Sequence, residues 1–158
     1  MILDYIERAH PEPSLLPATP FDIAKVQELS QFIELYFELV ARRLIPNLLT
    51  GSTPDSMVLK EVESSLDKAA AALPKLSTFE QFAYGDQFTL ADIAAILNLP
   101  IVRNVGKAFL DRDPLSDVPG LDAYCARMEE RPHVKKVRAD AAADRPQFMA
   151  HLKALYGF

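Results

Sequence analysis

Apolar residues recur at helical spacing along most of the chain, and no convincing run of residues alternates with a period of two. This periodicity limits the fold more than any other feature, because a half-buried strand needs a period of two to turn one face inward. We therefore expect an all-α fold, a helical bundle. The 158 residues fit one domain, and 49% apolar with 25% charged residues is typical of a globular protein.

The N-terminal residues differ from the rest of the chain. Residues 1–9 predict the last two turns of a helix without an N-cap, with four apolar residues at helical spacing: Ile2, Leu3, Tyr5 and Ile6. So short a helix is not stable alone in water and has to dock on something. Residues 10–19 carry Pro11, Pro13 and Pro17 and predict a linker. We expect the main helical domain over residues 20–158.

The helices of this domain are predicted from periodicity, caps and prolines. A long helix is expected from Phe21 to about Leu49, with its last turn disturbed at Pro46. A second begins at Thr53-Pro54-Asp55, with Thr53 as the N-cap. A third begins at Thr89 and is bent or divided at Pro100. The last three are expected over residues 119–130, just after Pro132, and over residues 146–155.

Charge and targeting signals exclude several classes of protein. The formal net charge is −5, and the one basic cluster (Arg131, Lys135, Lys136 and Arg138) is typical of a solvated helix face, so we expect no binding to nucleic acid. No apolar run reaches the roughly 20 residues that cross a bilayer, so we expect no membrane span. No signal peptide is visible, which favours a cytoplasmic location.

Residues that often bind metals or act as nucleophiles form no recognisable set. Cys125 is the only cysteine, which excludes an internal disulfide and a cysteine-based metal cluster, and we expect it to fill space on the apolar face of its helix. The three histidines share no ligand spacing, so no metal site is expected: His10, His133 and His151. We also expect no catalytic residue in this chain.

One string of residues is more specific than the helical pattern. Thr89-x-x-Asp92 fits a capping box, a structural device that ties a helix start to itself. The whole string from Tyr84 to Ala95, YGDQFTLADIAA, closely resembles the signature of the C-terminal helical domain of cytosolic glutathione S-transferases. Two further segments resemble the same family: Ile2–Glu7 with Leu15-Leu16-Pro17, and Pro119–Pro132.

The resemblance implies a function together with an absence. Residues 1–9 are similar to the end of the last helix of the family's thioredoxin-like domain, which binds glutathione and helps to form its thiolate. The rest of that domain is not found in this sequence. The resemblance therefore implies an electrophile-site and dimerisation domain, with glutathione as co-substrate of an intact protein. We expect a homodimer, and we expect the segment alone to be inactive.

The first long helix is the best candidate for the electrophile pocket. At about 100° per residue, one apolar sector holds Val26, Leu29, Ile33, Phe37, Val40 and Leu44. A second sector widens the apolar arc beyond what a surface helix needs, so a partner, a missing domain or a substrate has to cover it. Core packing is the competing interpretation for each residue. The candidate pocket residues are Phe32, Leu35, Tyr36, Leu39 and Arg43.

Two other interpretations stay open. The first is a non-catalytic helical interaction module, since domains similar to this one serve as assembly pieces in translation-factor subunits and synthetase appendages. A partner protein would then dock on Ile2, Leu3, Tyr5 and Ile6. The second is a helical ligand carrier, which rests only on the broad apolar arc and lacks an obvious polar anchor group.

Overall fold

The computed structural model describes residues 2–157. Within this range every regular element is a helix, which confirms the expected all-α class. The contacts divide the chain into two compact units, one that runs up to Tyr124 and a second that begins at Cys125. The described helices include none that is long and apolar enough to cross a membrane.

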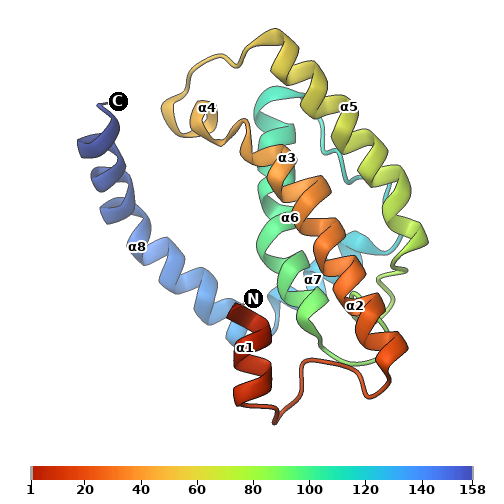
Figure 1. Cartoon of the computed structure of the whole chain (residues 1–158). Coiled ribbons are helices and arrows are strands. Elements are labelled where there is room, and N and C mark those ends of the chain that lie inside the picture. Colours follow the sequence, from red (N-terminus) through yellow and green to blue (C-terminus); the bar gives the residue numbers. More distant parts are fainter. Residues whose placement is uncertain (1, 158) are drawn as a thin grey trace. The chain divides into compact units, whose positions relative to one another are not determined.

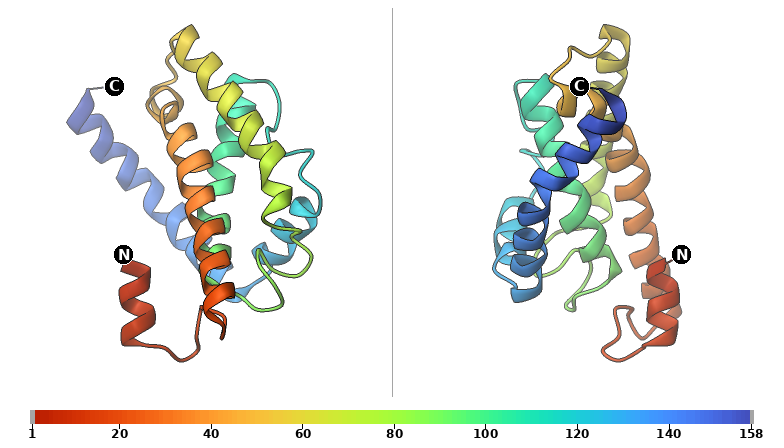
Figure 2. Two further views of the ribbon diagram at one scale, coloured as in Figure 1. Left: turned by 45° about the vertical axis from the view of Figure 1, so that its right-hand side comes forward. Right: turned by 90° about the vertical axis from the view of Figure 1, so that its left-hand side faces the viewer.

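The first unit begins with the short helix α1 (Ile2–Ala9). Residues 10–19 have no regular helix and loop out between α1 and α2 (Figure 2), as their prolines predict. Helix α2 (Pro20–Phe32) then starts at the N-cap Thr19, whose hydroxyl oxygen accepts a hydrogen bond from the Asp22 amide. Pro20 at the first helical position suits a helix start, because its missing N–H would have no partner there.

The first long helix continues as a π-helix, η1 (Ile33–Glu38), and ends with α3 (Leu39–Arg42). The Leu39 amide bonds to the Glu34 carbonyl, five residues back, which adds one residue to the turn. The chain then breaks at Arg43 and Leu44 before α4 (Ile45–Thr50). This break lies just before Pro46, which cannot donate to the carbonyl of Arg42.

Helix α5 (Ser56–Ala72) begins two residues later than expected, and its tail tightens into the 3-10 turn η2 (Leu73–Lys75). The N-cap is Asp55, so the prediction of Thr53 as the cap is wrong. The Asp55 carboxylate accepts from the amides of Met57 and Val58, which a charged oxygen does more strongly than a hydroxyl. Pro54 therefore precedes the helix.

Helix α6 (Leu90–Phe109) runs through Pro100 without being divided. Figure 1 shows α2, η1 and α3 (orange) lying along α6 (green), with α5 (yellow-green) packed beside them, as the contacts also record. The core of the first unit lies between these helices. The long helix and the break after it contribute six buried apolar side chains to this core: Val26, Leu29, Ile33, Phe37, Ala41 and Leu44.

Helix α7 (Leu121–Glu129) spans the boundary between the two units. The second unit continues into one helix of 25 residues, α8 (Pro132–Tyr156). The prediction of two separate helices was wrong, because Pro146 lies inside α8. A proline in a helix removes one backbone hydrogen bond and can be accommodated without ending the helix.

Candidate functional site

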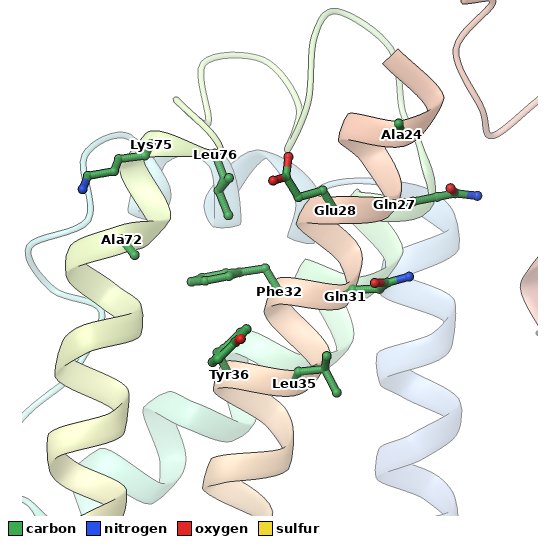
Figure 3. Close-up of a pocket in the computed structure, with 10 residues that line it drawn as sticks. All are labelled: Ala24, Gln27, Glu28, Gln31, Phe32, Leu35, Tyr36, Ala72, Lys75 and Leu76. Carbon is green, nitrogen blue, oxygen red and sulfur yellow. The ribbon is translucent and has the colours of Figure 1, made fainter. Parts of the chain in front are cut away.

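A groove of about 640 Å³ lies between the first long helix and the end of α5. Its residues from the long helix include three of the predicted pocket residues, Phe32, Leu35 and Tyr36. Figure 3 shows the rings of Phe32 and Tyr36 reaching from this helix toward Ala72 of α5. The two rings are tilted with their centroids 5.0 Å apart, which is a favourable aromatic arrangement. The groove therefore has an aromatic floor.

The second apolar sector stays exposed while the first is buried. Leu35, Tyr36 and Leu39 are 52%, 55% and 53% exposed, whereas neighbouring Ile33 and Phe37 have no exposed surface. Scattered exposed leucines are ordinary, but here three large apolar side chains lie exposed within five residues of one helix, and we call them the exposed patch. These three side chains offer apolar surface that a ligand or a partner could cover.

The groove does not include Leu39 or Arg43 among its lining residues. Arg43 instead pairs with Glu61 of α5, at 2.8 Å between Nη2 and Oε2. The π-helix explains this separation, because each of its residues turns through less than the 100° of an α-helix. The same shift places Ala41 in the core and leaves Val40 only half-buried.

The other wall of the groove was not predicted. It consists of Ala72, Lys75 and Leu76, and the long helix adds polar residues along the rim: Gln27, Glu28 and Gln31. Lys75 points away from the rings in Figure 3. No local pattern could reveal this wall, because α5 and the long helix are joined only by tertiary packing. The groove as a whole is a mostly apolar slot with a few amide groups, which is suited to an apolar or aromatic molecule.

The predicted capping box stands at the start of α6. Asp92 is fully buried, and its Oδ2 accepts from the Thr89 amide at 2.8 Å and from the Thr89 hydroxyl at 3.2 Å. Its Oδ1 accepts from the Ala83 amide at 2.8 Å and from the Tyr124 hydroxyl at 3.0 Å. One carboxylate therefore fixes the helix start, the preceding loop and α7 together.

Burial raises the pKa of Asp92 above its ordinary value of 3.8, and the hydrogen bonds from Ala83, Thr89 and Tyr124 only partly oppose this. A perturbed carboxylate can mark a catalytic site. Here every hydrogen bond of Asp92 serves the packing of α6, so the structure gives it a structural role, as the sequence predicts.

Residues with the chemistry of metal ligands do not come together in the described part of the chain: no group of three or more His, Cys, Asp or Glu side chains could hold an ion. Cys125 is half-buried. A second polar link joins the Tyr84 hydroxyl to Asp22 Oδ1 at 2.8 Å. Hydrogen bonds from Thr19 and from Tyr84 lower the pKa of the Asp22 carboxyl, and the bond to Asp22 raises the pKa of Tyr84.

Comparison with known proteins decides the family. The model of the glutathione S-transferase C-terminal domain matches residues 27–127. The chain belongs to the glutathione S-transferase family. A glutathione S-transferase of Pseudomonas putida strain F1 is 36% identical over 154 residues, which cover 98% of this chain and 70% of that protein. The FtsZ-localized protein A of Caulobacter vibrioides is 24% identical over 145 residues, covering 88% of this chain and 61% of that protein.

Solved structures share the glutathione S-transferase fold of this chain. A glutathione S-transferase from Rhodospirillum rubrum F11 is 25% identical with a TM-score of 0.65, covering 84% of this chain and 60% of that one. A maleylacetoacetate isomerase from Anaeromyxobacter dehalogenans, with dicarboxyethyl glutathione and citrate in its active site, is 24% identical with a TM-score of 0.64. The match covers 85% of this chain and 59% of the isomerase. The chain thus spans about 60% to 70% of the length of these relatives.

Proposed function

We propose that this chain is the electrophile-site and dimerisation domain of a cytoplasmic glutathione S-transferase-like protein. In that protein a thioredoxin-like domain would bind glutathione, and the helical chain would hold the electrophile that glutathione attacks. Support comes from the greater length of the relatives and from the glutathione derivative bound to the maleylacetoacetate isomerase. The assignment of residues 1–9 to the last helix of that domain, 10–19 to a linker and 20–158 to the helical domain is part of this proposal.

The observation that supports the proposal is the exposed patch of Leu35, Tyr36 and Leu39, of which Leu35 and Tyr36 line the aromatic groove. An electrophile with an aromatic or aliphatic body would gain about 25 cal/mol per Å² of apolar surface that it buries there. Phe32, Leu35, Tyr36, Leu39 and Arg43 remain our candidates for contacting it. Leu39 and Arg43 lie outside the groove, so they would contact only the part of the electrophile that extends beyond the groove.

Activation of the thiol requires groups that we assign to the thioredoxin-like domain. A thiol with a pKa near 8.5 needs a donor or a positive field to ionise at neutral pH. We therefore expect no glutathione conjugation by the 158-residue chain alone. Conjugation of an aryl halide by the purified chain would refute this division of labour.

The decisive experiment starts with the mass of the protein in its source cell, detected with an antibody against this segment. A species heavier than 17.6 kDa that binds glutathione and conjugates an aryl halide supports the proposal. In that species, Tyr36→Ser should raise the KM for the electrophile about three- to tenfold and leave the KM for glutathione unchanged. Leu97→Ser is the matched control, because Leu97 is also a large exposed apolar residue but does not line the groove. Size-exclusion chromatography with light scattering tests the homodimer.

The alternative is a non-catalytic helical interaction module. It is favoured by the similarity to a protein named for its localisation with FtsZ, and by the exposed apolar side chains of α1. A species of 17.6 kDa in the source cell, purified together with a protein partner that Tyr5→Ser releases, would favour this module over the enzyme.

A further inference from the structure

Helix α1 has an unusual distribution of buried and exposed side chains. Its four large apolar residues are exposed: Ile2 by 78%, Leu3 by 37%, Tyr5 by 72% and Ile6 by 44%. The one buried residue of this helix is a carboxylate, Glu7. A helix normally turns its apolar face inward and its charges outward. Apolar burial therefore does not hold α1 in place within the first unit.

Three hydrogen bonds occupy the buried carboxylate of Glu7. Its Oε1 accepts from the Ser14 hydroxyl at 2.7 Å, and both of its oxygens lie 3.1 Å from the Leu15 amide nitrogen. Bonds to an ionised acceptor are about twice as strong as bonds between neutral groups. The Glu7 carboxylate thus holds in place the proline-containing segment after α1, residues 10–19, which forms no regular helix.

The same segment, residues 10–19, is also hydrogen-bonded to the start of α6. The Leu15 carbonyl accepts from the Leu90 amide at 3.0 Å. Leu90 is the first residue of α6, where the amide has no acceptor within its own helix. A continuous route of polar contacts therefore runs from Glu7 through Leu15 to the helix start that Asp92 caps.

We propose that Glu7 is a positioning residue that sets the orientation of α1 relative to α6. Through this contact it also orients the thioredoxin-like domain, of which α1 would be the last helix and whose other elements would pack on the exposed apolar side chains of α1; the identity of that domain rests on the proposed function. In the proposed protein, glutathione binds to the thioredoxin-like domain and the electrophile binds in the groove of the helical domain. A rotation of α1 would therefore move the thiol of glutathione away from the electrophile.

Nuclear magnetic resonance on the 158-residue chain tests the contact itself. In Glu7→Ala, exchange of the Leu15 amide should accelerate roughly tenfold or more, and the Leu90 amide should follow because its acceptor moves. Residual dipolar couplings should then fit α1 and α6 to two different alignment tensors instead of one. Glu7→Gln keeps one acceptor oxygen and should retain a common tensor. Glu12→Ala, at an exposed acid of the same segment, is the matched control.

The two proposals can fail separately in this design. A common alignment of α1 and α6 in Glu7→Ala would overturn the role of Glu7, whatever the longer protein does. If the couplings separate as expected, the role of Glu7 stands even if no thioredoxin-like domain is found. In a longer, active protein, Glu7→Ala should lower kcat about tenfold while the KM for glutathione stays unchanged, and an unchanged kcat would overturn the effect on domain orientation.

Discussion

Replacing Asp92 by asparagine is expected to destabilise the first unit by about 2 to 4 kcal/mol. The carboxylate is fully buried and accepts four hydrogen bonds, two on each oxygen. Asparagine keeps one acceptor oxygen and replaces the other with an NH2 group. If the side-chain oxygen of the asparagine keeps the hydrogen bonds from Ala83 and Tyr124, then its NH2 group faces the backbone N–H and the hydroxyl of Thr89. The N–H of Thr89 then has no acceptor, and the α6 cap is lost.

The magnitude follows from these contacts. A buried donor left without an acceptor costs about 1 to 3 kcal/mol, and loss of an N-terminal cap costs about 0.5 to 2 kcal/mol. The two effects overlap at the Thr89 amide, so their sum is an upper limit. The opposite orientation of the asparagine side chain would leave the Ala83 amide without its acceptor, so it would lower the stability by a similar amount.

Urea unfolding followed by circular dichroism measures the effect. A loss of roughly 3 kcal/mol, with a slope of about 2 kcal/mol per molar urea, moves the midpoint down by roughly 1.5 M. Asp86→Asn is the control, because Asp86 is an exposed aspartate in the same connection. If Asp92→Asn moves the midpoint no further than Asp86→Asn does, the reasoning about the buried carboxylate is refuted.

Three further predictions concern pH, close packing and the exposed patch. Burial raises the folded-state pKa of Asp92, so the stability that its protonated form contributes is complete below pH 3.8 and is lost as the pH rises through the folded pKa. The difference in unfolding free energy between the wild type and Asp92→Asn should therefore decrease above pH 3.8. Urea midpoints that show this difference increasing with pH would contradict the prediction. In Gly106→Ala the new Cβ would lie 2.2 Å from Pro114 Cδ and 2.6 Å from the Arg112 carbonyl oxygen, so the melting temperature should fall by roughly 2 to 8 °C, against little change in Lys107→Ala. Tyr36→Ser should lower the free energy of unfolding by no more than about 1.5 kcal/mol, because it loses only an exposed ring and its contact with Phe32, whereas Phe37→Ala should lower it by about 3 to 5 kcal/mol. Similar losses for both variants would show that the patch is covered within the chain.

Much of the fold could be read from the sequence because its signals are local. Helical periodicity predicts the all-α class, and the Thr89–Asp92 box marks the start of α6 to the residue. The family could likewise be predicted from the string that surrounds this box, and the comparisons confirm it. Local signals also had limits: the α5 cap was misplaced from Asp55 to Thr53, since both residues are common caps and only the backbone geometry separates them.

The candidate site was only half predictable. The sequence identified the helix that carries Phe32, Leu35 and Tyr36, and it indicated that the apolar arc of this helix is too wide for the core alone. The sequence did not show the wall from Ala72 to Leu76, the π-helix that separates Leu39 and Arg43 from the groove, or the burial of Glu7. Periodicity and capping depend on residues within about four positions of each other, so they are written in the sequence. Which helix faces lie against each other depends on contacts between distant residues, and only the tertiary structure decides them.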